Sequence, residues 1–151
     1  MSWVRARGAA GAGGVQVFTY ADFQAIVSGT TTKVLPIYLV PNDGIYYISD
    51  VILERLTDFA GTSITAATVE IGKSGATAKY MAAGTDVFTG AKATAARTIG
   101  SNTTSVKPGN LEAAGQQLDC KITTTGANVS ALTAGEIAII VRLERIPTTG
   151  F

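Results

Sequence analysis

The residues best suited to acid–base chemistry are three carboxylates, Asp50, Glu54 and Asp58, in the run of apolar and polar residues from Tyr46 to Phe59. A pair of carboxylates at the right spacing is the catalytic equipment of glycosidases. Asp50 and Glu54 would lie on the same side of a strand, but four strand residues span about 13 Å. Glycosidase carboxyl groups are about 5 to 10 Å apart. We therefore interpret these residues as a solvated strand face, and a carboxylate-based enzyme is the alternative.

Histidine, the commonest general base and metal ligand, is absent from the 151 residues. Cys120 is the single cysteine, which excludes an intrachain disulfide and a cysteine-rich metal cluster. Because Cys120 alternates with Leu118 and Ile122, we expect it to be a buried apolar residue on a strand. The sequence therefore predicts a protein that is not an enzyme, with no catalytic, cofactor-binding or metal site and no cofactor.

Gly72-Lys73-Ser74 resembles the end of a phosphate-binding P-loop and follows a predicted strand. The P-loop requires a glycine five residues before the glycine of its Gly-Lys pair, and this chain has Ala67 at that position. It also requires a following helix, whose N-terminus helps to hold the phosphate. Here Gly75-Ala76-Thr77 leads toward another short strand. We therefore predict a turn that does not bind a nucleotide.

The charge content of the chain is low. Only 15% of the residues are charged, against about 25% in typical soluble domains. A net charge of +1 and a pI near 7.8 create no field that would attract DNA, RNA or a membrane surface. No run approaches the roughly 18 apolar residues of a transmembrane helix, so we expect no nucleic-acid and no membrane partner. An ordinary neutral protein would fit this composition, but we interpret the surface as one that other protein covers in an assembly.

The elements that would position any site begin after a distinct N-terminal stretch. Residues 1–14 contain a run of glycine and alanine and show neither helical nor strand periodicity. We predict a flexible arm there and a β-sandwich domain over residues 15–151. Trp3, Arg5 and Arg7 are residue types at which binding energy concentrates, so we expect them to anchor an arm that orders on a neighbouring subunit, with a frayed tail as the alternative. The stretch lacks the apolar segment of a signal peptide, so we expect synthesis in the cytoplasm.

A short helix is expected between Val15 and Val27. Thr19 and Asp22 have capping-box spacing, and Phe23, Ile26 and Val27 recur at helical intervals. Gly29 would end this helix.

Strand periodicity dominates the remaining sequence. In the strand from Tyr46 to Phe59 we expect Val51 and Leu53 on one face and Ile48 and Ile52 on the other. Pro36 indicates an edge position for the strand that contains it. With turns at 41–44 and 72–75, the predicted strands are Lys33–Val40, Tyr46–Phe59, Ser63–Ile71, Gln117–Thr125 and Glu136–Ile146, with shorter candidates around Tyr80–Met81, Val87–Phe88 and Thr103–Val106.

The C-terminal region gives the clearest pattern. Ile137, Ile139, Val141 and Leu143 alternate with residues such as Arg142 along the last strand. A single loop separates this strand from the preceding one, so we expect the two to be antiparallel neighbours. Seven or eight strands and almost no helix predict an all-β fold, an antiparallel β-sandwich, jelly-roll-like, with an extended N-terminal arm.

Two stretches carry a resemblance to a known family. The strand ending in Thr123-Thr124-Thr125 is followed by Leu132-Thr133-Ala134-Gly135-Glu136-Ile137 and a long apolar closing strand. Earlier, Val69-Glu70-Ile71-Gly72 is followed by Tyr80-Met81 and Asp86-Val87-Phe88. In this alternation of threonine-rich loops with apolar strands, the region from Ile48 to Ile146 resembles the jelly-roll proteins of tailed-phage virions, of the capsid decoration or cement type.

The resemblance implies a bacteriophage structural protein that is made in the host cytoplasm and located in the virion. It would bind and stabilise the outer capsid shell, with the major capsid protein and further copies of itself as partners, the latter in a homotrimer. The alternative is a tail or fibre component that binds a host glycan. Tyr46 and Tyr47, beside the turn at 41–44, are the candidates for that site, although core packing would account for at least one of them.

Overall fold

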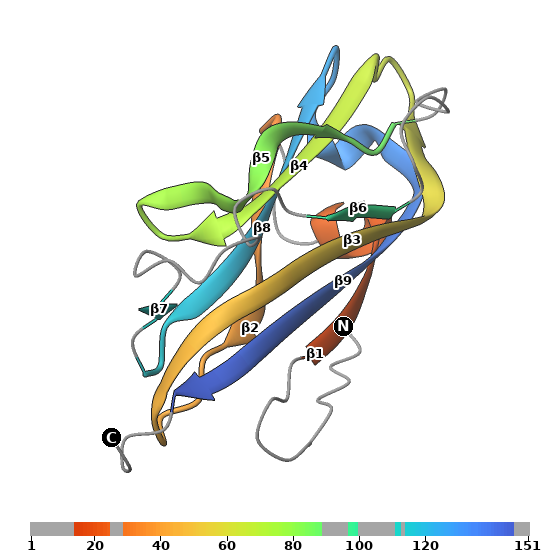
Figure 1. Cartoon of the computed structure of the whole chain (residues 1–151). Coiled ribbons are helices and arrows are strands. Elements are labelled where there is room, and N and C mark those ends of the chain that lie inside the picture. The colour runs from red at the N-terminus through yellow and green to blue at the C-terminus, as the bar shows by residue number, and fades with distance from the viewer. Residues whose placement is uncertain (1–13, 25–28, 89–96, 100–110, 113, 147–151) are drawn as a thin grey trace.

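The computed structural model of the chain describes residues 14–24, 29–88, 97–99, 111–112 and 114–146. Most of these residues lie in strands of two antiparallel sheets that pack face to face (Figure 1). The first sheet has the order β1-β9-β3-β6, with β7 also pairing with β3, and the second has the order β2-β8-β4-β5. The predicted all-β antiparallel sandwich is therefore confirmed. The strands are β1 (Gly14–Thr19), β2 (Thr32–Leu39), β3 (Ile45–Gly61), β4 (Ala66–Lys73), β5 (Ala76–Asp86), β6 (Arg97–Ile99), β7 (Leu111–Glu112), β8 (Gln117–Thr125) and β9 (Leu132–Ile146).

The pairing order shows how the chain is wound. Apart from the two-residue β7, β1 pairs with β9, β2 with β8, β3 with β6 and β4 with β5, all antiparallel. This nested order is that of a long antiparallel ribbon folded over on itself. The pairing of β9 with β3 and of β8 with β4 then joins the ribbon into two sheets. Eight strands in this arrangement form a jelly roll, as the sequence predicted.

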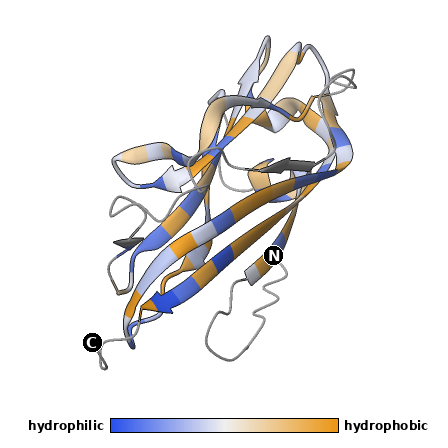
Figure 2. Cartoon of the chain, in the orientation of Figure 1, coloured by the Kyte–Doolittle hydropathy of each residue, from blue (hydrophilic) through white to orange (hydrophobic). Residues whose placement is uncertain are grey.

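Buried and exposed residues alternate along the strands, and the buried ones form the core between the sheets. The odd-numbered residues from Ile137 to Leu143 are buried, whereas Arg142 and Glu144 are exposed. Figure 2 shows the corresponding alternation of apolar and polar bands along β3 and β9. Cys120 on β8 is fully buried, as expected. Each fully buried Ile, Leu or Val contributes about 1.5–3 kcal/mol, so this double layer is the main source of stability.

The short helix α1 (Tyr20–Gln24) follows β1 and packs against β9 and the 3-10 helix η2 (Val129–Ala131). The Thr19 N–H donates to the Asp22 carboxylate over 2.8 Å, so the predicted capping pair is confirmed. The expected short helix is present, and it begins at Tyr20, in the middle of the predicted range. The chain before Thr19 is β1, because the open edge of β9 supplies strand pairing for its backbone groups. Residues 25–27 lie outside the described residues.

The expectation that the last two long strands are neighbours is wrong. β8 lies between β2 and β4, whereas β9 lies between β1 and β3, so the two strands belong to opposite sheets. The loop that contains η2 passes from one sheet to the other. Packed sheets are only about 10 Å apart, a distance that a loop of this length spans easily, and strand alternation carries no information about which sheet a strand joins.

The faces of β3 differ from the prediction at one residue. Val51 and Leu53 share the core as expected, but Ile48 is buried with them instead of sharing a face with Ile52. The step from Ile48 to Asp50 on β3 corresponds to a single step from Leu143 to Arg142 on β9. This β-bulge shifts the alternation by one residue and returns Ile48 to the inner face.

The remaining elements follow the sequence pattern with adjusted limits. Pro36 lies on β2, an edge strand of the second sheet, as predicted. Tyr80 and Met81 belong to the longer β5, and Phe88 forms only an isolated bridge with Phe59. The strand predicted around 103–106 lies outside the described residues. Among the residues that the structure describes, no helix has the length and apolarity required to span a membrane.

Candidate functional site

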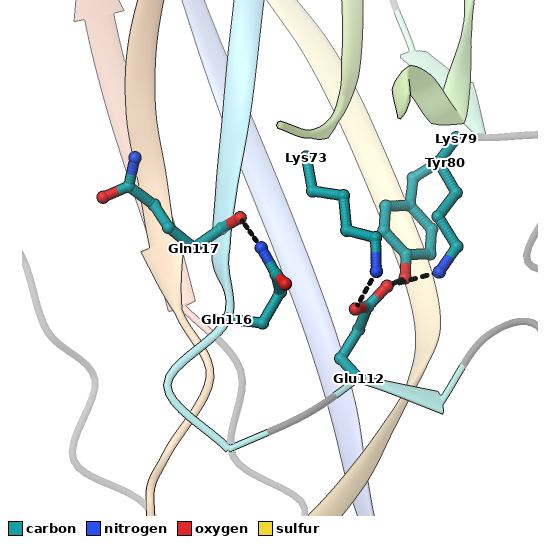
Figure 3. Close-up of polar contacts among 6 residues, drawn as sticks. All are labelled: Lys73, Lys79, Tyr80, Glu112, Gln116 and Gln117. Atoms are coloured by element: carbon teal, nitrogen blue, oxygen red, sulfur yellow. Dashed lines mark hydrogen bonds and ion pairs between the residues drawn. The ribbon is translucent and has the colours of Figure 1, made fainter. Parts of the chain in front are cut away.

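Glu112 is the centre of a group of interacting charged side chains (Figure 3). The Lys73 ammonium lies 2.8 Å from Oε2, and the Lys79 ammonium and the Tyr80 hydroxyl both donate to Oε1. The Glu112 side chain is 0% exposed, whereas those of Lys73 and Lys79 are 27% and 21% exposed. We call these four residues the Glu112 cluster. It ties β7, which pairs with β3 of the first sheet, to the β4–β5 hairpin of the second.

The electrostatics of the Glu112 cluster favour the ionised carboxylate. Desolvation raises the pKa of Glu112, but the hydrogen bonds from Lys73, Lys79 and Tyr80 outweigh it, and the pKa lies below its ordinary value. Burial, followed by the hydrogen bond to Glu112, raises the pKa of Tyr80 far above its ordinary value. A general base that works near neutral pH needs a pKa of about 7. With a lowered pKa and three donors already bound, the Glu112 carboxylate is suited to holding two sheets together.

Sequence reasoning did not identify the Glu112 cluster. Lys73 belongs to the predicted turn, but Glu112 is more than 30 residues away from both Lys73 and Lys79 along the chain. The only signal was an acidic residue next to Leu111, in a stretch without clear periodicity. Charge pairing across that separation is set by the jelly-roll winding, which places β7 beside β3 and near the β4–β5 turn.

The carboxylates on β3 form separate contacts. Asp50 lies opposite Arg142 in an ion pair of 3.7 Å, and Asp58 forms an ion pair of 2.8 Å with Arg55. Glu54 lies opposite Ala138, four residues along β3 from Asp50. This arrangement agrees with the interpretation of these carboxylates as a strand face. Within the described residues, no group of three His, Cys, Asp or Glu side chains is placed to hold a metal ion.

The segment that resembles a P-loop is a hairpin turn. β4 ends at Lys73 and β5 begins at Ala76, with Ser74 and Gly75 in the turn, so a strand follows where a P-loop needs a helix. Gly72 is required here by packing, because a Cβ at this position would lie 2.0 Å from the carbonyl oxygen of Ala76. The Lys73 ammonium forms an ion pair with Glu112.

The two tyrosines proposed for a glycan site differ in exposure. Tyr46 is buried, and its hydroxyl donates to Asp43 Oδ1 over 2.7 Å. Tyr47 lies opposite Glu144 on the outer face, and its hydrogen bond to that carboxylate raises its pKa. Tyr46 therefore has the core-packing role that was expected for at least one of the pair.

The proposed arm residues Trp3, Arg5 and Arg7 lie outside the described residues. β1, the first described element, begins at Gly14, and the predicted sandwich domain begins at Val15. β1 is an edge strand of the first sheet.

Comparison with known proteins shows that the fold of this chain is similar to that of a solved structure. No protein-family model and no curated protein matches the sequence. Among solved structures, a chain from the structure named "Cyanophage Pam1 capsid asymmetric unit" is similar with a TM-score of 0.55 and 16% sequence identity. The similarity covers 96% of this chain and 94% of that chain. This chain therefore shares its fold with that chain over nearly the whole length of both.

Proposed function

We propose that this chain is a structural protein of a phage virion and that it is associated with the capsid. The observation that carries the proposal is the structural similarity to a chain of a phage capsid unit, which covers 96% of this chain and 94% of that chain. Many unrelated proteins share the jelly roll, so the proposal is supported by the extent of the similarity over both chains and not by the fold class alone.

Within the capsid, the role that we propose is that of a decoration or cement protein, without catalytic activity, bound to the outer shell. The composition supports this role, since only 15% of the residues are charged. Some of these charges are neutralised inside the chain, in the Glu112 cluster and in the ion pair of 3.2 Å between Glu70 and Lys121. A surface with few free charges is better suited to contact with protein than to permanent exposure to water.

The partners in this proposal are the major capsid protein and other copies of the chain, with three copies forming a homotrimer on the shell. The mechanism is mass action. A subunit that binds only the closed lattice stabilises that lattice by its free energy of binding. Repetition over the shell adds avidity, so no single contact has to be tight.

Residues 1–13 are the proposed shell-binding arm. They precede β1, and in extended form 13 residues reach roughly 45 Å. Trp3 would fill an apolar pocket on the shell, and Arg5 and Arg7 would pair with acidic groups around it. Alternate residues of an extended chain point to the same side, so these three side chains would face the shell together.

The experiment uses phage particles that lack this protein, to which the purified chain is added before sedimentation. We expect the full chain to co-sediment with the particles and the variant lacking residues 2–13 to stay in the supernatant. Trp3→Ala should weaken binding, whereas Leu56→Ala, a matched change at an exposed apolar residue of β3, should not. Circular dichroism shows whether each variant is folded.

Two outcomes contradict different parts of the proposal. Binding of the truncated variant at the level of the full chain would contradict the arm, while leaving the capsid role intact. Absence of binding by the folded full chain would contradict the capsid role itself.

A further inference from the structure

The edge strands of the two sheets differ in protection. Exposed edges are usually guarded against pairing by charged residues, proline or bulges. Among the described strands at the sheet edges other than β1, the sequence has Lys33 and Pro36 in β2, Lys79 and Asp86 in β5 and Arg97 in β6, and β7 has only two residues. The register of β5 against β4 also shifts twice. β1, with the sequence Gly-Val-Gln-Val-Phe-Thr, contains neither a charge nor a proline, so among the described edges it alone lacks these guards.

An apolar surface reaches the same edge. Val15, Ile140 and Ile52 lie opposite one another across β1, β9 and β3. In the next row, Val17 and Ala138 lie opposite each other, and Glu54 on β3 lies on the other side of Ala138, away from the β1 edge. Val15 and Val17 are 41% and 40% exposed, whereas Ile52 and Ala138 are 7% and 8% exposed. Apolar exposure on this outer face therefore rises toward the β1 edge, where a further strand would cover it.

We propose that β1 pairs antiparallel with β1 of a second copy of this chain, so that the first sheets of two copies form one continuous sheet. A two-fold axis through Gln16 places Val15 of each copy opposite Val17 of the other. Residues directly opposite in an antiparallel pair point to the same face. The four valines then form one apolar patch, which continues into Ile140 of each copy.

The pattern of β1 favours an identical strand over an unrelated peptide. Val15 and Val17 have almost equal exposure and are placed symmetrically about Gln16, so the strand is complementary to itself. An extended peptide of another protein would gain nothing from this symmetry.

This pairing does not depend on the proposed capsid role, because it involves only the chain itself. A trimer closes through a heterologous contact, whereas the β1 contact is isologous and links copies in pairs.

The first test is sedimentation equilibrium of the full chain and of two matched variants. Val17→Lys places a charge in the proposed contact, and Val34→Lys places the same charge at a valine of β2 that is 47% exposed. We expect the wild type and Val34→Lys to form dimers or multiples of dimers. The association of Val17→Lys should be weaker by a factor of roughly ten or more. A monomeric wild type, or equal association of the two lysine variants, would overturn the proposal.

The second test reports the register and does not depend on the lysine variants being folded. Opposite residues of an antiparallel pair have Cα atoms about 4.5–5.5 Å apart, which suits a disulfide. A mixture of Val15→Cys and Val17→Cys chains should form a covalent dimer on oxidation, and each variant alone should form far less. Cys120 is fully buried and does not compete. Equal cross-linking of the separate variants and the mixture would contradict the proposed axis.

Discussion

Replacement of Glu112 by glutamine removes the negative charge of the Glu112 cluster and keeps the shape of the side chain. Removing one partner of a buried ion pair costs about 3–5 kcal/mol. The Glu112 side chain is 0% exposed, but those of Lys73 and Lys79 are 27% and 21% exposed and can turn toward water. The expected loss of unfolding free energy is therefore at the lower end, about 3 kcal/mol. For a chain of this size the Tm should fall by roughly 6–12 °C.

The assay is thermal and urea unfolding of the wild type, Glu112→Gln and Asp50→Asn, followed by circular dichroism. Asp50→Asn is the matched control, because it removes a carboxylate from the exposed ion pair with Arg142. An exposed pair contributes about 0–1 kcal/mol, so the control should remain close to the wild type. Equal unfolding free energies for the two variants would refute the interpretation of the Glu112 cluster as a link between the sheets.

The difference in unfolding free energy between the wild type and Glu112→Gln should depend on pH, and the direction of the change follows from the pKa of Glu112. The pKa of Glu112 is lowered in the folded chain, so folding favours its ionised form. The resulting stabilisation is complete above the pKa of the unfolded chain, about 4.3, and is lost as the pH falls through the lower folded value. The difference between the wild type and Glu112→Gln should be largest near neutral pH and should narrow below about pH 4. A constant difference down to about pH 3 would contradict this linkage.

Two further predictions concern the core and the backbone. Burial raises the pKa of the Cys120 thiol to about 12, so the native chain should react with a disulfide reagent roughly 100-fold more slowly than the urea-unfolded chain; equal rates would show that β8 is accessible. At Gly135, φ is +136° and a Cβ would lie 2.4 Å from the Phe59 ring, so Gly135→Ala should lower the unfolding free energy by about 2–4 kcal/mol. Gly29→Ala, also at positive φ but in open space, should cost about 1 kcal/mol, and equal losses for the two variants would contradict the packing argument.

The fold class could be predicted because burial is periodic along most strands. Ile139 and Val141 on β9 and Cys120 on β8 alternate with residues that are more exposed than they are, and this pattern identifies a half-buried strand. Alternation identifies a strand and its inner face, but it does not assign the strand to a sheet. For that reason β8 and β9 were expected to be neighbours, although the jelly roll places them in opposite sheets.

Local departures from the regular pattern could not be predicted. The β-bulge between Ile48 and Asp50 depends on the register against β9, which no residue of β3 reveals by itself. Val15 and Val17 could have belonged to either a helix or a strand until pairing with β9 decided between them. The Glu112 cluster depends on residues that are distant in the chain, and only the winding of the jelly roll brings them together.

The proposal that the chain is a structural component of a phage capsid is tested most directly by its stoichiometry in purified particles. Quantitative mass spectrometry of the intact virion, and of its separated capsid and tail fractions, measures the copies of this chain relative to the major capsid protein. We predict a copy number comparable with that of the shell protein, with the chain recovered in the capsid fraction. A few copies per particle, recovery with the tail, or absence from the virion would contradict the proposed capsid role.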